Sequence, residues 1–300
     1  NPMSLERLEI EGTFNFRDLG GPTTEAGDRR VRSGKVFRAD GLAQLSDRAR
    51  ADIGELGIGT VIDLRDIGER AKLPDALDGL DVRHVELPVF DDHFFPSRPM
   101  SREEMKAAAE ATGMDLSDRS LSRIYDLMIT HFGHRLAAAV DLIAESCTDG
   151  VVFHCSAGKD RTGVIGAFLL DLLGVGRQEI VDEYAITSTH LSGGFLDAIT
   201  RNFSDAGISG NLAETAVAAP PELMHEILDR TEAEHGAASA KDDGQPGGVE
   251  AYLLAHGMDP ATPERLRQCL LESASDRGWA RPQGALSCPA GTCSPCETKR

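Results

Sequence analysis

The sequence predicts an α/β protein with a central mixed or parallel sheet flanked by helices, and two observations support this. Short runs rich in Val, Ile, Phe and Leu have the length of buried strands. The longer segments between them carry apolar residues at helical spacing. Strands that alternate with helices in this way form a sheet that is covered on both faces. With 300 residues, of which 41% are hydrophobic, the chain suits one large domain or a domain with a helical cover.

The predicted elements follow this alternation through the first two thirds of the chain. The strand-like segments are the residues around Phe37 and residues 60–64, 82–87 and 151–153. Residues 46–57 are expected to form a helix with Ser46 as its N-cap. Residues 120–146 carry apolar residues at helical spacing, with a break near Gly133. Together these elements predict a core domain over residues 10–190.

Beyond residue 190 the pattern is helical but less regular. The helix-like segments are residues 195–203, 214–217, 221–234, 248–257 and 263–273. Residues 236–248 are rich in Gly and Asp and predict a disordered insertion. Residues 249–279 are expected to close the fold with two helices. Residues 280–300 contain many Pro, Gly and Ser residues and predict a disordered tail.

The most informative segment is residues 154–163, which read His-Cys-Ser-Ala-Gly-Lys-Asp-Arg-Thr-Gly. A strand-like run precedes this segment, and an apolar helix-like run follows it. A tight loop of small residues between a strand and a helix turns successive backbone N–H groups inward, and the helix N-terminus adds partial positive charge. The segment therefore predicts an anion-binding loop at the carboxyl end of a strand, where ligands bind in such sheets.

The side chains of this loop suit chemistry at a phosphate group. Backbone dipoles and nearby cations favour the thiolate form of a cysteine at the position of Cys155. Arg161 presents a planar fork that matches two phosphate oxygens. Thr162 is expected to donate its hydroxyl proton toward the sulfur. The loop residues expected to hold the substrate are Ser156, Ala157, Gly158, Lys159 and Thr162.

The loop resembles that of the cysteine-dependent phosphatases, which is Cys, five residues, Arg, then Ser or Thr. The full string is most similar to the bacterial atypical tyrosine phosphatases of the mycobacterial protein-tyrosine-phosphatase B type, which also act on phosphoinositides. Further segments match that family in its order between about residues 12 and 190. They are residues 15–21 (Asn-Phe-Arg-Asp-Leu-Gly-Gly), 36–40, 61–65 followed by Glu69 and Arg70, and 183–188, where Glu183 replaces the usual Asp.

The resemblance implies the cysteine-phosphatase fold, with residues 191–235 as a helical lid over the site. It also implies hydrolysis of phosphomonoesters through a cysteinyl-phosphate intermediate on Cys155, without a metal or another cofactor. The expected substrates are phosphotyrosine proteins, with phosphoserine, phosphothreonine and phosphoinositides as further candidates. Lys159 completes the pattern His-Cys-x-x-Gly-Lys-x-Arg of phosphoinositide phosphatases, so lipid or mixed specificity is as well supported as strict tyrosine specificity.

The proton donor is harder to assign from the sequence. Asp160 lies inside the loop, where the resembled family proposes an alternative donor, and it is our first choice. Asp63, at the end of a neighbouring strand, is the second. Asp91 or Asp92, after the strand that ends near Leu87, is the third, because a mobile acid loop would lie there.

Two other classes of protein share parts of this pattern. A rhodanese-like sulfurtransferase would carry a persulfide on Cys155, but the ending Gly-Lys-Asp-Arg-Thr-Gly argues against it. A catalytically silent phosphate-binding module would need no nucleophile, so the presence of both Cys155 and Arg161 argues against that reading.

Composition limits the partners and the location. A net charge of −18 argues against nucleic acid as a partner and against a strongly basic membrane-binding surface. No apolar run approaches the ~20 residues of a membrane span, and no signal-peptide core is seen, so a cytoplasmic location is expected. The six cysteines predict a reducing compartment in preference to a disulfide framework, with Cys147 as a small buried hydrophobe. The tail cysteines Cys288, Cys293 and Cys296 lack the fourth ligand of a structural zinc site.

Overall fold

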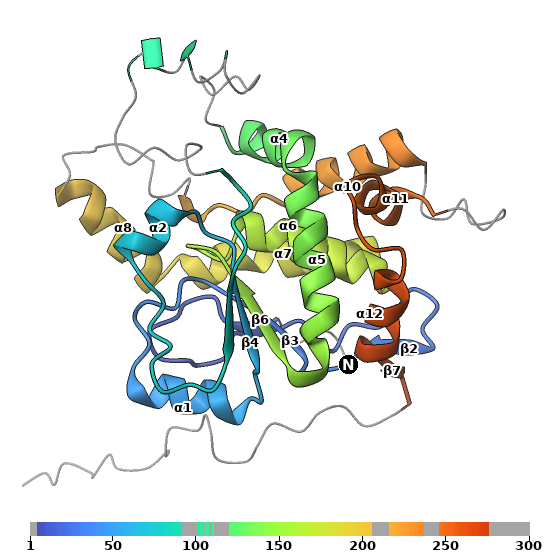
Figure 1. The fold of residues 1–300 in the computed structure, drawn as a ribbon, viewed down its shortest axis with the longest axis horizontal. Coiled ribbons are helices and arrows are strands. Elements are labelled where there is room, and N and C mark those ends of the chain that lie inside the picture. Colours follow the sequence, from blue (N-terminus) through green and yellow to red (C-terminus); the bar gives the residue numbers. More distant parts are fainter. Residues whose placement is uncertain are drawn as a thin grey trace, which may run out of the picture.

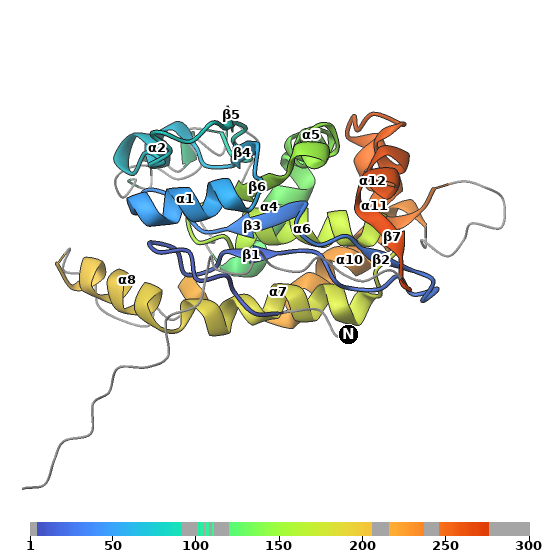
Figure 2. The ribbon, with the colours of Figure 1, turned by 90° about the horizontal axis from the view of Figure 1, so that it is seen from below.

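The structure, a computed structural model, describes residues 5–91, 101, 103–104, 106–107, 110, 120–205, 216–236 and 246–275. Its centre is a five-stranded mixed sheet in the order β1-β3-β6-β4-β5, in which β1 is antiparallel to β3 and the other pairs are parallel. The strands are β1 (Arg17–Asp18), β3 (Val36–Ala39), β4 (Thr60–Asp63), β5 (Arg83–Glu86) and β6 (Val151–His154). The predicted α/β class with a mixed sheet is therefore confirmed (Figures 1 and 2).

Alternate residues of the strands serve two separate cores. In β6, Val152 joins the smaller core, which includes residues of α1 (Asp47–Glu55). Val151 and Phe153 point to the opposite face and join the larger core. That core is built on the helices α4 (Leu121–His131), α5 (Gly133–Ser146), α6 (Asp160–Leu172), α7 (Arg177–Leu191), α11 (Gly248–Ala255) and α12 (Thr262–Leu270).

The elements with strong apolar patterns form as predicted. The Ser46 side chain caps α1 by accepting a hydrogen bond from the Ala49 N–H at 3.1 Å. The expected break in residues 120–146 lies at Phe132, between α4 and α5. The helix α6 is buried on almost every side, which explains why it lacks a polar face.

Several short elements were not predicted. The helix α2 (Ile67–Lys72) and the two-stranded sheet of β2 (Arg29–Val31) with β7 (Leu271–Ser273) carry no clear periodicity. The predicted helix over residues 263–273 is wrong at its end, because α12 stops at Leu270 and the chain continues as β7. Pairing with β2, reinforced by a 2.9 Å ion pair between Arg30 and Glu272, outweighs local helix propensity there.

The region expected to form a lid contains two different helices. Of these, α10 (Pro221–His235) buries Leu223, Met224, Ile227 and Leu228 in the larger core. In both ribbon views α8 (Gly194–Asp205) instead extends away from the body of the molecule. A movement of residues 191–235 as one unit would have to break the core packing of α10, and the predicted lid stays a prediction.

Some predictions fall on residues that the structure does not describe. These are half of the expected helix over residues 214–217, most of the insertion over 236–248, and the tail over 280–300. At the edges of the insertion, the Gly248 N–H donates to the Gly236 carbonyl at 2.6 Å. None of the described helices is long and apolar enough to cross a membrane.

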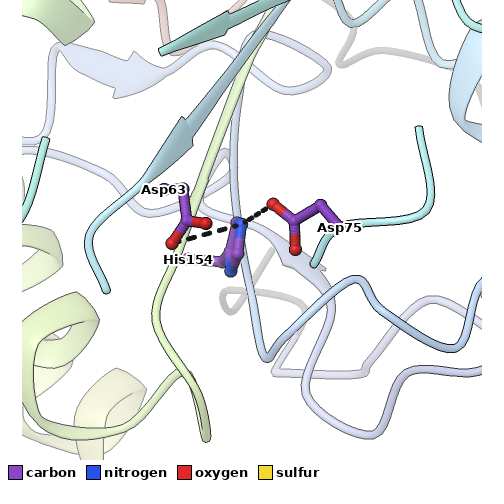
Figure 3. A group of neighbouring side chains, drawn as sticks. All are labelled: Asp63, Asp75 and His154. Atoms are coloured by element: carbon purple, nitrogen blue, oxygen red, sulfur yellow. Dashed lines mark hydrogen bonds and ion pairs between the residues drawn. The ribbon is translucent and has the colours of Figure 1, made fainter. Parts of the chain in front are cut away.

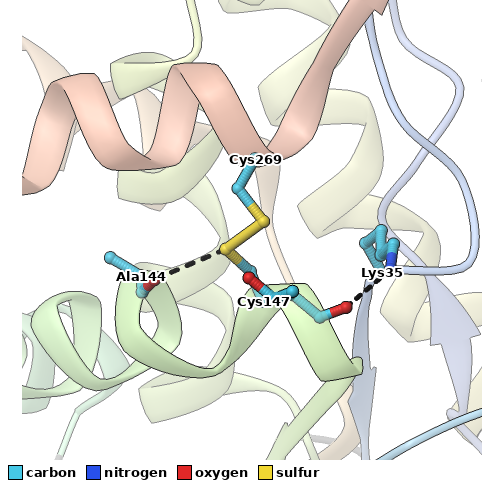
Figure 4. Close-up of a disulfide and its surroundings, with 5 residues drawn as sticks. Lys35, Ala144, Cys147 and Cys269 are labelled. Atoms are coloured by element: carbon cyan, nitrogen blue, oxygen red, sulfur yellow. Dashed lines mark hydrogen bonds between the residues drawn. A yellow bond between two sulfur atoms is a disulfide. The ribbon is translucent and has the colours of Figure 1, made fainter.

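A disulfide joins Cys147, just after α5, to Cys269 in α12 (Figure 4). The expectation of reduced thiols is therefore wrong for this pair, although Cys147 is buried as predicted. The two cysteines lie 122 residues apart in the sequence, and the packing of α12 against α5 brings their Cα atoms to 6.5 Å. No local pattern could have indicated this contact.

Candidate active site

The loop after β6 has a backbone that only glycine can provide at one position. Gly158 has φ of +65°, a conformation that L side chains rarely adopt. A Cβ atom there would lie 2.3 Å from the carbonyl oxygen of Ala39. The loop therefore packs directly against β3, and α6 begins two residues later at Asp160. This geometry places the start of α6 beside Cys155, whose side chain is almost completely buried.

Side chains of two matched N-terminal segments, residues 15–21 and 36–40, bind the backbone of the loop. The Asn15 side-chain amide donates to the carbonyl oxygens of Ala157 at 3.1 Å and Gly158 at 3.0 Å. The Arg38 guanidinium donates to the Gly158 oxygen as well, at 2.6 Å. Because the C=O and N–H of a trans peptide point in opposite directions, bonds to these carbonyls turn the corresponding amides toward the pocket.

A buried ion cluster fixes the Arg38 side chain. The Glu183 carboxylate in α7 accepts from Arg17 Nε and Arg38 Nη1, each at 2.7 Å. Burial opposes ionisation of Glu183, but the two guanidinium charges hold the pKa of its carboxyl below the ordinary value. Burial and the charge of Arg38 lower the pKa of Arg17 to about 10. The residue that replaces the family's usual Asp thus links both motif arginines, and the matched segments meet behind the loop.

Arg161 lies at the base of the site and is held by Glu69. Its Nη1 and Nη2 atoms contact the two Glu69 carboxylate oxygens at 2.6 and 2.8 Å. The Ser156 hydroxyl, predicted to bind substrate, donates to the same carboxylate at 2.6 Å. The Phe90 ring centroid lies 5.6 Å from the guanidinium carbon. The orientation of Arg161 is therefore set by Glu69 and Phe90, which come from two separate segments, and Ser156 in turn helps to hold Glu69.

Glu69 belongs to the segments that match the phosphatase family, but the sequence indicated no role for it. It is the third residue of α2, where Asp66 and Glu69 form a reciprocal capping box. Burial alone would raise its pKa, but hydrogen bonding and the charge of Arg161 lower the pKa of the Glu69 carboxyl to about 2. The sequence signal Asp-x-x-Glu was visible, but it indicated only a helix start.

The loop acid Asp160 is partly exposed and is contacted by two neighbouring side chains. Its side chain is 28% exposed and receives a 2.8 Å hydrogen bond from the Tyr125 hydroxyl at Oδ1. Lys159 lies 3.6 Å from the same oxygen and is almost completely buried. Its ammonium donates to the Ala216 carbonyl at 2.9 Å, which draws it toward the segment before α10. Lys159 is thus not an open substrate contact in this structure.

The other carboxylates considered as proton donors lie in different surroundings. Asp63 is fully buried, and Arg65 binds both of its oxygens at 2.9 and 2.8 Å. This enclosure makes Asp63 less suited than the partly exposed Asp160 to donating a proton, and its role stays a prediction. Asp91 forms an exposed ion pair with Arg135 at 3.2 Å, and Asp92 lies outside the described residues.

The His154 side chain lies between the carboxylates of Asp63 and Asp75 (Figure 3). Its Nδ1 lies 3.0 Å from the Cys155 carbonyl and its Nε2 2.8 Å from Asp75 Oδ2. Both ring nitrogens must therefore donate, which requires the imidazolium form. Burial alone would lower its pKa, but the hydrogen bond and charge of Asp75 raise the pKa of His154 above the ordinary value.

Asp63, Asp75 and His154 have metal-binding atoms within 4.8 Å of one another. Arg65 already contacts both carboxylates, reaching Asp75 Oδ1 at 2.8 Å. Two carboxylates, one guanidinium and one imidazolium balance in charge. The donor set is therefore compensated by side chains, and a dication would have to displace Arg65.

Thr162 differs from expectation. It is fully buried, and its hydroxyl has no hydrogen-bond partner among the described residues. The predicted bond to the Cys155 sulfur is therefore not formed, and a contact of Thr162 with substrate stays a prediction. The loop amides and Arg161 remain the groups that could hold a tetrahedral anion beside the buried Cys155.

The comparisons with known proteins agree with this class of site. A model of the tyrosine phosphatase family matches residues 8–272, and the chain belongs to this family. It is 33% identical to a tyrosine-protein phosphatase of Nostoc commune over 77% of this chain and 72% of that one. It is 28% identical to the triple specificity protein phosphatase PtpB of Mycobacterium tuberculosis over 88% and 98% of the two chains.

A solved structure is more distant. The crystal structure of P. aeruginosa TpbA gives a TM-score of 0.32 at 16% identity, over 66% of this chain and 96% of that one. The family membership identifies the protein as a phosphoric monoester hydrolase, as the loop had predicted.

Proposed function

We propose that this phosphatase acts through a covalent cysteinyl-phosphate on Cys155. The observation that carries the proposal is the loop itself, in which a buried cysteine faces inward-turned amides and a fixed arginine. The Cys155 thiolate attacks phosphorus, and the bond to the leaving oxygen breaks as that oxygen takes a proton. Water then attacks the cysteinyl-phosphate and releases inorganic phosphate with the restored thiolate.

Asp160 is proposed as the acid of the first step and the base of the second. It is the partly exposed carboxyl of the loop, whereas Asp63 is enclosed by Arg65. Arg161 holds two oxygens of the transferring group, and the loop amides receive the charge that develops on them. Neither a metal nor an organic cofactor enters these steps.

For the substrate, we propose phosphotyrosine proteins together with phosphoinositides. The relative from M. tuberculosis is named a triple specificity phosphatase. In this chain Lys159 could serve a second phosphate only after leaving the Ala216 carbonyl, so broad specificity would depend on movement of that segment. The cytoplasmic location expected from the sequence stays a prediction. The Cys147–Cys269 disulfide argues against it, because disulfides favour a less reducing compartment.

The first test replaces the nucleophile. Cys155→Ser should abolish turnover of an aryl phosphate, because a hydroxyl does not ionise near neutral pH. Phosphate or vanadate binding should persist, since the amides and Arg161 remain. Turnover near the wild-type rate by this variant would overturn the covalent mechanism. Thiosulfate turnover without phosphatase activity would instead select the sulfurtransferase reading.

A further inference from the structure

The loop acid has an unusual buried partner. Tyr125, from α4, is 1% exposed, and its hydroxyl lies 2.8 Å from Asp160 Oδ1. The same hydroxyl lies 2.8 Å from that of Tyr184 in α7, and the two rings pack edge to face with centroids 6.3 Å apart. Two hydroxyls in series thus connect α7, through α4, to one carboxylate oxygen of the loop.

Chemistry fixes the direction of the hydrogen bonds that link Tyr184, Tyr125 and Asp160. An ionised carboxylate only accepts, so Tyr125 donates its single proton to Asp160, and Tyr184 donates to Tyr125. Burial raises the pKa of Tyr125 well above its ordinary value, which keeps this donor protonated at working pH. The two hydrogen bonds therefore run in one direction, from Tyr184 through Tyr125 to Asp160 in the loop.

The contacts of Asp160 are one-sided. Within the described part of the chain, both the Tyr125 hydrogen bond and the Lys159 ion pair fall on Oδ1. Because Oδ1 is already occupied as an acceptor, a proton carried by the carboxyl belongs on Oδ2. The side chain is partly exposed, and Oδ2 is the oxygen that these two contacts leave for a substrate.

We propose that Tyr125 is a positioning residue that holds Oδ1 of Asp160 and thereby presents the protonated Oδ2 to the leaving-group oxygen. Tyr184 orients the Tyr125 hydroxyl, and neither tyrosine touches the substrate. The proposal rests on the proposed role of Asp160 as general acid. It also links α4 to the rate of the chemical step.

Removal of the Tyr125 hydroxyl should have a distinctive kinetic effect. Tyr125→Phe should slow phenyl phosphate hydrolysis about tenfold, part of the ~10²–10⁴-fold that general acids contribute. A phosphate ester with an activated leaving group, 2,4-dinitrophenyl phosphate, should be affected less than about threefold, because its leaving oxygen needs no proton.

The pH profile gives a readout that a merely structural role would not move. The charged and titratable groups around Asp160 are Lys159 and Arg161 in the loop, with Tyr125 and Tyr184 behind it. Loss of one donor to the carboxylate disfavours its ionised form. The basic limb of kcat against pH for phenyl phosphate should therefore move to higher pH in Tyr125→Phe.

A matched control is Tyr252→Phe. Tyr252 is another buried tyrosine, and its hydroxyl donates to the Ile129 carbonyl at 2.6 Å, away from the loop. This variant should show neither the leaving-group effect nor the pH change. If Tyr125→Phe fails to fold, Tyr184→Phe tests the proposal in its place. This variant should slow phenyl phosphate hydrolysis about threefold.

The variant Asp160→Asn distinguishes the proposed role of Asp160 as general acid from the positioning role of Tyr125. If it slows phenyl phosphate selectively while Tyr125→Phe and Tyr184→Phe behave like Tyr252→Phe, the positioning role is overturned and the acid assignment stands. If Asp160→Asn shows no leaving-group dependence, the acid assignment fails, and the positioning role fails with it.

Discussion

At the scale of single residues, the site depends on side chains that are already paired before substrate arrives. Arg161 is held by Glu69, and His154 by Asp75 and the Cys155 carbonyl. Fixed charges of this kind need little reorganisation during the reaction, which is where enzymes gain most from electrostatics. These pairings also make the native fold sensitive to acid.

Glu69 provides a test of that acid sensitivity. Its pKa is lowered from 4.5 to about 2 in the folded protein, so its stabilising effect is complete above pH ~4.5 and is lost as pH falls toward 2. The shift corresponds to at most about 3 kcal/mol. Glu69→Gln should therefore lower the free energy of unfolding at pH 7 and flatten its decline between pH 4.5 and 2, as measured by urea unfolding.

The control for this measurement is Glu86→Gln. Glu86 contacts Arg70 at 3.1 Å, but its side chain is 56% exposed, and exposed pairs stabilise little. Equal acid profiles for the wild type and Glu69→Gln would show that the Arg161 pair does not contribute to folding stability.

At the scale of elements, the sequence patterns worked best where burial imposes a regular apolar spacing. The strands β3, β4 and β6 are buried along their whole length, and α1, α4 and α5 each bury one side, so their apolar residues could be recognised. The strand β5 was also predicted, although it is mostly exposed. The short β1, β2, β7 and α2 could not be predicted, because pairing and capping partners decide them.

The same distinction holds for the site. Cys155 and Arg161 lie within one decapeptide, and their spacing alone indicated the chemistry. Glu69, Asp75 and Tyr125 reach the site from positions 35 or more residues away. Their roles depend on tertiary contacts that no local pattern contains.

The disulfide offers a test at this scale. Removing the cross-link with Cys147→Ala and Cys269→Ala should lower the free energy of unfolding by about 2–5 kcal/mol, because the bond closes a long loop. The melting temperature should fall by roughly 5–15 °C. Reductant should lower the melting temperature of the wild type and of Cys155→Ser alike, but not that of the double variant. A wild type that is insensitive to reductant would contradict this.

At the scale of the whole molecule, charge sets the long-range interaction with substrate. The net charge is −18, while Arg161 and the N-terminus of α6 bring positive charge to the site itself. An anionic substrate is therefore expected to be repelled at a distance. The flanking charge of a phosphopeptide should therefore matter.

Phosphotyrosine peptides flanked by Lys should have several-fold higher kcat/KM than matched peptides flanked by Glu at ~20 mM NaCl. The two values should converge near 0.5 M NaCl, where screening shortens the reach of the field. A phenyl phosphate control should change less with salt than either peptide. A preference for acidic flanks at low salt would locate a basic surface that outweighs the net charge.

The anchoring of the loop also bears on how the enzyme is made. Asn15 binds loop carbonyls 142 and 143 residues downstream, and Arg17 binds Glu183 and Thr187 more than 160 residues downstream. Such contacts form late, because long chain segments must first come together. A growing polypeptide on the ribosome would contain Cys155 well before α7 has emerged to complete the support. The nascent enzyme would therefore stay inactive until synthesis had passed that helix, which confines hydrolysis to chains that have nearly finished folding.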